Sequence, residues 1–338
     1  DWSSDVCSSD LVNDINNSIE GSYVGIGLEY EVFNDSVFIT HVLDKSPAQK
    51  AGLQSGDILL RAGSKIISAK GIEADSVKNA IRGEQGSDIT LTVMRSNKPI
   101  LVKVTRDVVP VNSIVASYRV NDTTGYLRIE SFTTQTHREF MEALQELQKK
   151  PLKKLILDLR GNGGGVMDEA IEIADEFLEG DKLITYTEGK HSPRKEYRCR
   201  RKGQFEDGKL IVLCNDESAS ASEILLGALQ DWDRATIIGN TSFGKGLILQ
   251  QYDLSNGGAI RLSIARYFTP LGRSIQRSYK NGMMAYYKEA LEYNRPNDST
   301  SLKHPFITRG GKKLYVSNGI TPDILAFPDT TYTDSILF

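Results

Sequence analysis

Strand-like and helix-like segments alternate through the second half of this chain. GYLRIESF (residues 125–132) has the pattern of a strand, and residues 136–150 have the apolar periodicity of an amphipathic helix. The apolar runs LILDL, KLIVLCND and ATIIGN follow as strands, separated by helical patterns over residues 167–178 and 221–232. Strands joined through helices normally pair in parallel, so this alternation predicts an α/β core with a largely parallel sheet.

The part of the chain before this core has a different pattern. YVGIGLEYEV and DSVFITHVL alternate like strands of a small sheet, and DITLTVMR and ILVKVTRD predict a hairpin. Between these strands, Ser46 followed by Pro47 predicts the start of a short helix, and Gly52 predicts its end. The chain therefore divides into a small domain over residues 21–107 and a larger domain over residues 108–338.

The N-terminal segment, residues 1–20, stands apart from both domains. Its first eleven residues, DWSSDVCSSDL, show no apolar periodicity and are similar to translated adaptor sequence. We therefore expect residues 1–20 to be adaptor-like or truncated, and we expect no role for Cys7 in the fold.

Composition excludes several classes of function. The net charge is −3 and there is no long basic block, which argues against nucleic acid as the main partner. No apolar run has the length of a membrane span.

The cysteines and histidines show no pattern of a disulfide or metal site. Cys214 lies in an apolar run and is predicted to be a buried thiol, and a disulfide between Cys199 and Cys214 has no support in the sequence. The spacing of the four histidines predicts no metal site; they are His41, His137, His191 and His304.

Three serines lie between a predicted strand and a predicted helix. The segment SASASE contains Ser218, Ser220 and Ser222. Ser220 and Glu223 have the S-x-x-E spacing of a helix capping box, so Ser220 can be read as a structural N-cap. The free N–H groups of a helix N-terminus also stabilise a developing oxyanion, so the structural and catalytic readings are compatible.

A lysine in a glycine-rich loop follows the next strand. Lys245 lies in GNTSFGKG, which fits the first seven positions of a phosphate-binding P-loop. A P-loop needs Ser or Thr after the lysine and then a helix, whereas Gly246 and a strand-like run follow here, so we expect no nucleotide. A lysine can instead activate a serine hydroxyl as a base if its surroundings lower its pKa. The glycine turn RGNGGG could place a backbone N–H next to a reacting carbonyl, although it also fits an ordinary turn.

Several blocks of the sequence carry a family resemblance. SPAQKAGLQSGD resembles the PDZ domains of bacterial proteases. NDESASASEILLGALQDWDRATIIGNTSFGKG closely resembles the carboxy-terminal processing, or tail-specific, serine proteases, and LILDLRGNGGG, AIRLSIARYFTPLGRSIQ and NGITPDI are similar to that family as well. The resemblance implies a ClpP/crotonase-like α/β protease core with an inserted or N-terminal PDZ domain.

The resemblance also implies roles for individual residues. Ser220 matches the nucleophile and Lys245, 25 residues later, matches the general base. We expect Lys245 to be enclosed by apolar groups such as Phe243 and Leu247. The other implied positions are an oxyanion hole from the N–H groups of Ala221 and of Gly164 or Gly165, a structural acid at Asp231, a peptide carboxylate-binding loop at Gly25, Ile26, Gly27 and Leu28, and a PDZ sensor at Arg95.

Three of these positions have open alternatives or depart from the family. The carboxylate-binding loop can also be a glycine-rich strand start without a ligand, and Arg95 can be an ordinary exposed arginine. The family usually has Gln four residues after the lysine, where this chain has Leu249. A one-residue β-bulge could bring Gln250 to that position instead.

The sequence therefore predicts a serine endopeptidase that cleaves proteins near their C-termini by a Ser–Lys mechanism. The PDZ domain would bind the free C-termini of protein or peptide substrates, and no cofactor, metal, nucleotide or nucleic acid is expected. One alternative is a catalytically impaired relative that binds peptides or other ligands, and another is a PDZ scaffold without activity. The resemblance implies a periplasmic or cell-envelope location, and the sequence leaves open whether the chain forms a homo-oligomer.

Overall fold

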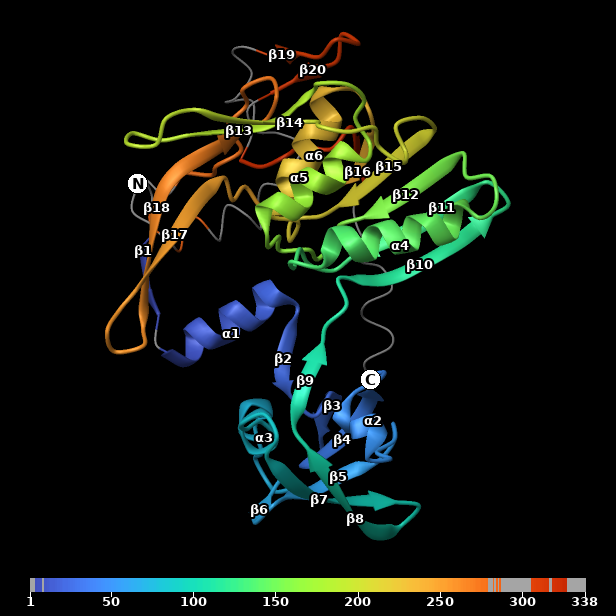
Figure 1. Cartoon of the computed structure of the whole chain (residues 1–338), viewed down its shortest axis with the longest axis vertical. Coiled ribbons are helices and arrows are strands. Elements are labelled where there is room, and N and C mark those ends of the chain that lie inside the picture. Colours follow the sequence, from blue (N-terminus) through green and yellow to red (C-terminus); the bar gives the residue numbers. More distant parts are fainter. Residues whose placement is uncertain are drawn as a thin grey trace. The chain divides into compact units, whose positions relative to one another are not determined.

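The computed structural model describes residues 4–7, 9–278, 282, 284, 286, 305–315 and 318–326 (Figure 1). The chain forms two compact units. The smaller unit runs from Gly21 to Val111, and the larger one combines Asp1–Glu20 with Asn112–Phe338.

The smaller unit contains a six-stranded antiparallel sheet and two helices. The sheet order is β3-β4-β5-β7-β8; a short strand β6 pairs with β5, and β2 and β9 form a separate antiparallel pair. The elements are β2 Ser22–Gly25, β3 Leu28–Phe33, β4 Ser36–Val42, α2 Pro47–Lys50, β5 Ile58–Ala62, β6 Lys65–Ile66, α3 Ala74–Ile81, β7 Asp88–Arg95, β8 Lys98–Thr105 and β9 Asp107–Pro110.

The predicted helix signals of the smaller unit are confirmed. Ser46 is the N-cap of α2 and its side chain accepts a hydrogen bond from the N–H of Gln49 at 3.1 Å, with Pro47 as the first helical residue. Gly52 follows the helix with a φ of +84°. At the end of α3, the Arg106 guanidinium donates to the carbonyl of Ile81 at 2.9 Å, which fixes that helix end to the sheet.

The larger unit contains the predicted parallel sheet. Its six strands lie in the order β10-β11-β12-β15-β16-β21, and every neighbouring pair is parallel except β10 with β11. These strands are β10 Ile114–Asn121, β11 Thr124–Ile129, β12 Lys154–Asp158, β15 Lys209–Cys214, β16 Thr236–Gly239 and β21 Ile324–Leu325. The α/β core predicted from the alternating pattern is therefore confirmed.

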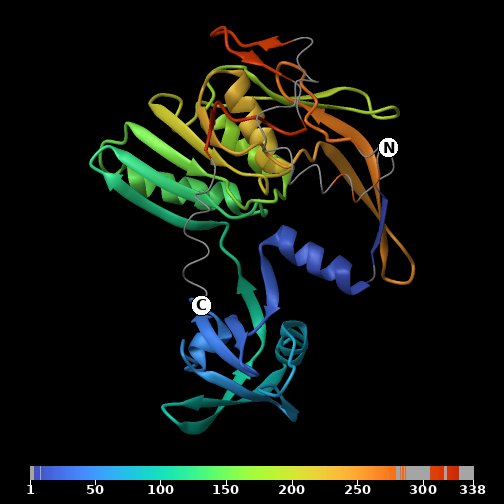
Figure 2. The ribbon, with the colours of Figure 1, turned by 180° about the vertical axis from the view of Figure 1, so that it is seen from behind.

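Three helices cover one face of this sheet. They are α4 Thr136–Gln148, α5 Met167–Asp175 and α6 Ala221–Asp231. They lie in front of the strands in Figure 1 and behind them in Figure 2. The helices and strands share one buried apolar cluster, in which the ring of Phe140 packs edge-on against Phe177 at 5.7 Å. Every residue of α6 is buried, so this helix is fixed rigidly within the core.

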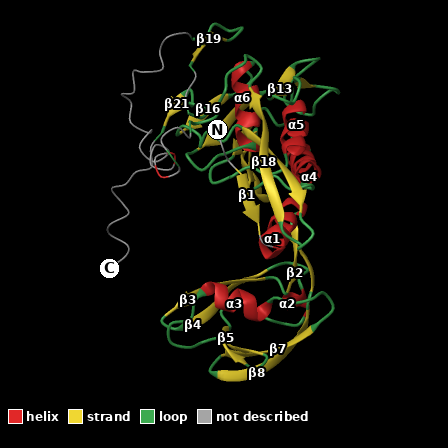
Figure 3. Ribbon diagram, turned by 90° about the vertical axis from the view of Figure 1, so that its left-hand side faces the viewer, coloured by secondary structure: helices red, strands yellow, loops and turns green. Residues whose placement is uncertain are grey.

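A second sheet of the larger unit is antiparallel. It contains β18 Ala259–Phe268, β13 Leu183–Glu188, β14 Lys195–Arg198 and β17 Leu247–Asp253. Figure 3 shows the long strand β18 extending beside the helices of this unit. The remaining short strands, β19 Phe306–Ile307 and β20 Lys313–Leu314, pair with each other.

The N-terminal segment has regular structure. Strand β1, Ser4–Cys7, pairs antiparallel with residues 259–262 of β18, and helix α1 spans Ser9–Glu20. A strand edge offers unpaired backbone groups to any extended segment near it, so this pairing does not require apolar periodicity in residues 4–7.

Parallel strands bring three turns of this unit to one edge. The turns Gly161–Gly165, Asn215–Ser220 and Asn240–Gly246 follow the carboxyl ends of β12, β15 and β16, which are neighbours in the sheet. The carboxyl edge of a parallel sheet is where α/β proteins usually place their ligands. The predicted nucleophile Ser220, the predicted base Lys245, and Gly164 and Gly165 all lie in these turns.

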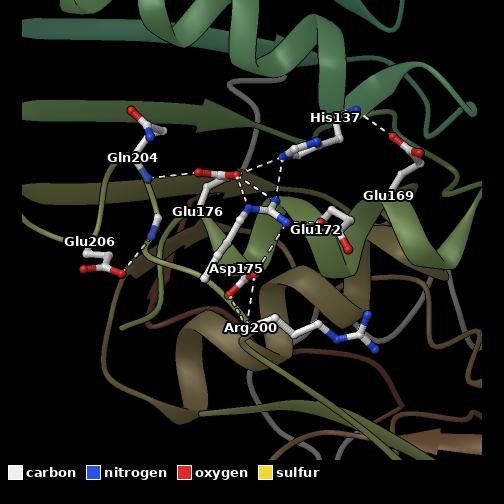
Figure 4. Close-up of polar contacts among 10 residues, drawn as sticks. His137, Glu169, Glu172, Asp175, Glu176, Arg200, Gln204 and Glu206 are labelled. Carbon is white, nitrogen blue, oxygen red and sulfur yellow. Dashed lines mark hydrogen bonds and ion pairs between the residues drawn. The ribbon is translucent and has the colours of Figure 1, made fainter. Parts of the chain in front are cut away.

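A buried polar network fastens the loop after β14 to α4 and α5 (Figure 4). Glu176 is only 2% exposed, and its carboxylate contacts the His137 ring at 2.9 Å, the Arg201 guanidinium at 2.8 Å and the N–H of Gln204 at 2.9 Å. Burial alone would raise the pKa of Glu176, but these hydrogen bonds and the positive charge of Arg201 lower it to about 2.

Three absences hold for the described residues. Cys199 and Cys214 are both free and buried, so they form no disulfide with each other. No helix of this part of the chain is long and apolar enough to cross a membrane. No three His, Cys, Asp or Glu side chains gather there in a way that could hold a metal ion.

The Glu176 network predicts a pH-dependent contribution to stability. Because the folded pKa lies below the ordinary value of 4.5, the ionised carboxylate stabilises the fold above pH 4.5, and this contribution is lost as the pH falls toward 2. We expect Glu176→Gln to lower the free energy of unfolding by about 2 to 3 kcal/mol at pH 7. Urea unfolding followed by tryptophan fluorescence measures this difference at several pH values.

Glu179→Gln is the matched control, because this nearby glutamate is 75% exposed. The difference between Glu176→Gln and the wild type should shrink below pH 4.5, while Glu179→Gln should change little at any pH. A constant difference between pH 7 and pH 3 would contradict the assignment of the low pKa.

Candidate active site

Ser220 lies at the start of the buried helix α6 in a strained backbone conformation. Its φ of +56° and ψ of −113° are rare for a residue with a side chain. Its N–H donates to the Glu223 carboxylate at 2.9 Å, and its carbonyl accepts the N–H of Glu223 at 2.9 Å. The S-x-x-E spacing therefore does mark the helix start, and the turn that it closes presents a half-buried serine.

The hydroxyls of the two neighbouring serines donate hydrogen bonds to backbone carbonyls. Ser218 donates its hydroxyl to the carbonyl of Leu159 at 2.8 Å, and Ser222 donates to the carbonyl of Asn162 at 3.0 Å. Both side chains are fully buried. Their hydroxyls fix the glycine turn after β12 against the serine turn, which leaves Ser220 as the accessible serine of the three.

Glu223 joins the serine turn to the lysine loop. This glutamate is fully buried, and its Oε2 accepts the N–H of Ser220 at 2.9 Å and the N–H of Lys245 at 2.8 Å. Its Oε1 accepts the N–H of Gly244 at 2.7 Å and the Ser242 hydroxyl at 2.6 Å. Burial raises the pKa of the Glu223 carboxyl, and these four donors oppose that rise by stabilising the charged form.

Tyr267 joins the same two segments through their carbonyl groups. This residue of β18 is 3% exposed, and its hydroxyl contacts the carbonyl oxygen of Ser220 at 3.0 Å and that of Lys245. Burial raises the pKa of Tyr267 well above its ordinary value, and the charge of Glu223 adds to the rise, so the hydroxyl keeps its proton as a donor.

The Lys245 side chain is exposed, so the expected apolar enclosure is wrong for this structure. Phe243 is half-buried but packs edge-on against Tyr286 at 5.7 Å, and Leu247 is half-buried at the start of β17. The buried side of the lysine loop is filled by the polar groups of Glu223 and Tyr267 instead of apolar side chains. The structure therefore fixes the main chain of Lys245 and leaves its amine in solvent.

The glycine turn after β12 packs directly against the serine turn. A Cβ on Gly164 would lie 2.6 Å from the carbonyl oxygen of Ala219 and 2.7 Å from Cβ of Ser220, so only glycine fits there. Gly164 donates its own N–H to the side-chain oxygen of Asn162 at 2.9 Å. Within the part of the chain that the structure describes, the N–H groups of Gly165 and Ala221 have no protein acceptor.

The sequence did not decide whether Gly164 or Gly165 supplies the second N–H of the predicted oxyanion hole. Because the N–H of Gly164 is already used by Asn162, Gly165 is the glycine whose N–H remains available beside Ala221. Asn162 was not singled out from the sequence, although its place between Gly161 and Gly163 in RGNGGG could have marked it.

The β-bulge near Leu249 lies on the partner strand. Ile248 pairs with Ala265 and Leu249 pairs with Ser263, so the extra residue is Ile264 of β18. Strand β17 therefore keeps its alternation, and Gln250 is exposed on the face opposite Leu249. The bulge that would bring Gln250 to the Leu249 side of the strand is absent from β17.

Asp231 forms an ion pair and a hydrogen bond that hold the turn after β18. It lies at the end of α6 with its carboxylate fully buried, 2.5 Å from the Arg273 guanidinium. Its second oxygen accepts the N–H of Leu271 at 2.9 Å. These bonds fasten the turn after β18 to α6 and do not involve the turns around Ser220.

In the smaller unit, the loop Gly25–Leu28 is held tightly. The carbonyls of Ile26 and Gly27 accept N–H groups of Ala48 and Leu43 at 2.7 and 3.1 Å. Gly27 has a φ of +80°, and a Cβ there would lie 2.3 Å from Cβ of Ser46. The glycine is required by this close approach, and the loop is set in a fixed shape before any ligand binds.

Arg95 forms an ion pair with a buried carboxylate inside the smaller unit. Its guanidinium donates to both carboxylate oxygens of Asp57, at 2.7 and 2.6 Å, and to the carbonyl of Gly52 at 2.8 Å. Asp57 is 1% exposed, so Arg95 compensates a buried charge and fixes the turn between α2 and β5.

The chain is similar in sequence and in fold to known proteins. Residues 123–282 match the family model described as Peptidase family S41, and residues 24–105 match that of the PDZ domain. A "Carboxy-terminal-processing protease" of Bartonella bacilliformis is 37% identical over 274 residues, which cover 79% of this chain and 62% of that protein. A "Probable CtpA-like serine protease" of Staphylococcus epidermidis is 32% identical over 273 residues, which cover 80% of this chain and 55% of that protein.

The chain thus spans less than two thirds of the length of these two curated relatives. Among solved structures, a "Photosystem II D1 C-terminal processing protease" has a similar fold, with a TM-score of 0.52 and 24% identity. That match covers 96% of this chain and 78% of the other.

The close packing of Gly164 predicts different responses from two adjacent glycines. Gly164→Ala should lower the free energy of unfolding by about 1 to 3 kcal/mol, because the new Cβ meets backbone atoms and the φ of +98° is unfavourable for alanine. Gly163→Ala is the matched control, because a Cβ there has open space around it. Urea unfolding of both variants measures the difference, and equal stability would contradict the close approach of the two turns.

Proposed function

Because residues 123–282 belong to peptidase family S41 and residues 24–105 to the PDZ domain family, we propose that this chain is a serine endopeptidase that cleaves proteins near their C-termini. The single observation that carries the proposal is the bridge made by Glu223. One carboxylate oxygen accepts the N–H groups of Ser220 and Lys245, so the proposed nucleophile and base belong to one site.

The proposed reaction follows the geometry of the three turns. Lys245 accepts the proton of the Ser220 hydroxyl, and Ser220 Oγ attacks the carbonyl carbon of the scissile peptide bond. The N–H groups of Ala221 and Gly165 donate to the resulting oxyanion. As the tetrahedral intermediate collapses, the C–N bond breaks and the protonated Lys245 gives its proton to the departing amine. Lys245 then takes a proton from water, whose oxygen attacks the acyl-serine, and that proton returns to Ser220 Oγ as the acid product leaves.

Because Lys245 is exposed, we propose that the bound substrate itself shields its amine from water. A peptide lying across the site would cover Lys245 and exclude water from its amine, which favours the neutral form that acts as a base. The strained backbone of Ser220 supports the same reading, because such conformations cluster at functional sites.

The PDZ domain would select the substrate. We propose that the fixed loop Gly25–Leu28 receives the C-terminal carboxylate through its backbone N–H groups and that the peptide adds to the sheet as a strand. In this scheme Arg95 supports the domain through its pair with Asp57, and a sensing role would act by breaking that pair. A periplasmic or cell-envelope location is part of the proposal and rests on the family resemblance.

A specific observation favours a second candidate, a catalytically impaired peptide-binding relative. Leu249 stands where the family usually has Gln, and Gln250 lies on the opposite face of β17. Without an orienting group the lysine amine is held less well, which slows proton transfer without removing it.

Peptide cleavage tests the main proposal. The wild type should cleave an unstructured peptide with a free C-terminal carboxylate, and should cleave its C-terminal amide more slowly because the PDZ loop loses its anion. Ser220→Ala and Lys245→Ala should each reduce cleavage by about a thousandfold or more. Lys190→Ala, a change at an exposed lysine, is the control and should retain wild-type activity.

A fluorophosphonate label separates the two candidates. An active serine peptidase is labelled at Ser220 and loses the label in Ser220→Ala, whereas an impaired relative binds the peptide without labelling. Wild-type cleavage by either the Ser220 or the Lys245 variant would contradict the Ser–Lys assignment.

A further inference from the structure

The hydroxyl of Tyr267 bridges two carbonyl groups that belong to the proposed nucleophile and base. It contacts the carbonyl oxygen of Ser220 at 3.0 Å and the carbonyl oxygen of Lys245. A phenol has one proton to donate, so the two carbonyl oxygens share it as a three-centre bond. Tyr267 lies 47 residues from Ser220 and 22 from Lys245 in the chain, so the contact exists only in the folded state.

A second bond from the same residue holds the lysine loop. The backbone N–H of Tyr267 donates to the carbonyl of Gly246 at 3.1 Å, directly beside Lys245. Tyr267 of β18 therefore donates hydrogen bonds to two consecutive carbonyls of the loop, those of Lys245 and Gly246. The side chain is 3% exposed, so water cannot easily replace its hydroxyl in these bonds.

Glu223 and Tyr267 complement each other. The Glu223 carboxylate accepts the N–H groups of Ser220 and Lys245, while the Tyr267 hydroxyl contacts their carbonyl oxygens. Both backbone polar groups of both residues are therefore bonded to the same two buried side chains. The relative position of the two backbones is fixed even though the Lys245 amine is exposed.

From this arrangement we infer that Tyr267 is a positioning residue of the Ser–Lys site, which holds the lysine loop in register with the serine turn. The inference rests on the proposed function. Tyr267 touches no reacting atom; it acts through the main chain of the two residues that do. Loss of its hydroxyl removes a donor from the Lys245 carbonyl, while the Ser220 carbonyl still accepts the N–H groups of Glu223 and Ile224. The side-chain tie between the two segments is then lost, and the lysine loop can shift relative to Ser220.

Tyr267→Phe tests the inference, because it removes the hydroxyl and keeps the ring. We expect the rate of fluorophosphonate labelling at Ser220 to fall by about tenfold to a hundredfold, since small misplacements of reacting groups have effects of this size. The kcat for peptide cleavage should fall by a similar factor with KM nearly unchanged. The final extent of labelling should stay at the wild-type level, because the fold persists and each site still reacts.

Tyr186→Phe is the matched control. Tyr186 is a buried tyrosine of the same sheet, on β13, whose ring stacks on Phe268 at 4.9 Å. Tyr186→Phe should label at the wild-type rate. A role in stability alone would instead lower the urea midpoint and the final extent of labelling in Tyr267→Phe, and leave the rate per reactive site unchanged.

The outcomes distinguish this inference from the function on which it rests. If the wild type and Tyr267→Phe are labelled at Ser220 at the same rate, the positioning role of Tyr267 is wrong and the Ser–Lys mechanism stands. If the wild type is not labelled at Ser220, the proposed function itself is wrong. A lower extent of labelling at an unchanged rate would also overturn the positioning role.

Discussion

The buried carboxylate of Glu223 is the interaction on which the site depends. A fully buried charge is costly unless it is well paired, and this one accepts hydrogen bonds from four donors in two segments. Two of these donors are the N–H groups of Ser220 and Lys245. The cost of leaving a buried carboxylate without partners therefore opposes any separation of the serine turn from the lysine loop.

The fold supplies the setting for this bridge. Parallel strands β12, β15 and β16 bring three turns to one edge of the sheet, and α6 is buried along its whole length. Gly164 lets the first turn approach the second to a distance that no other residue would permit. Tyr267 then reaches from the antiparallel sheet to the carbonyls of the same two residues. The backbone of the proposed dyad is thus held by buried side chains, whereas the Lys245 side chain is exposed.

Local patterns in the sequence predicted much of this structure. Alternating strands and helices predicted the α/β core, and the cap at Ser46 predicted α2. The quoted motifs indicated a resemblance to carboxy-terminal processing proteases and PDZ domains, which the matches to the peptidase family S41 and PDZ models confirm. Contacts between distant segments could not be predicted. No local signal marks Tyr267 as a partner of Ser220. The exposure of Lys245 depends on the polar groups of distant segments that fill the buried side of its loop. The position of the β-bulge depends on how β17 and β18 pair, so the sequence of β17 alone could not place it in β18.

The most direct test of the central bridge is the labelling rate of Ser220 in a folded Glu223→Gln variant. The neutral amide must place an NH₂ group against a backbone N–H or the Ser242 hydroxyl, so at least one buried donor loses its acceptor. Glu217→Gln, a change at an exposed glutamate of the same turn, is the control. We predict that Glu223→Gln reacts with fluorophosphonate at least about a hundredfold more slowly than the control. Equal rates in the two folded variants would contradict it.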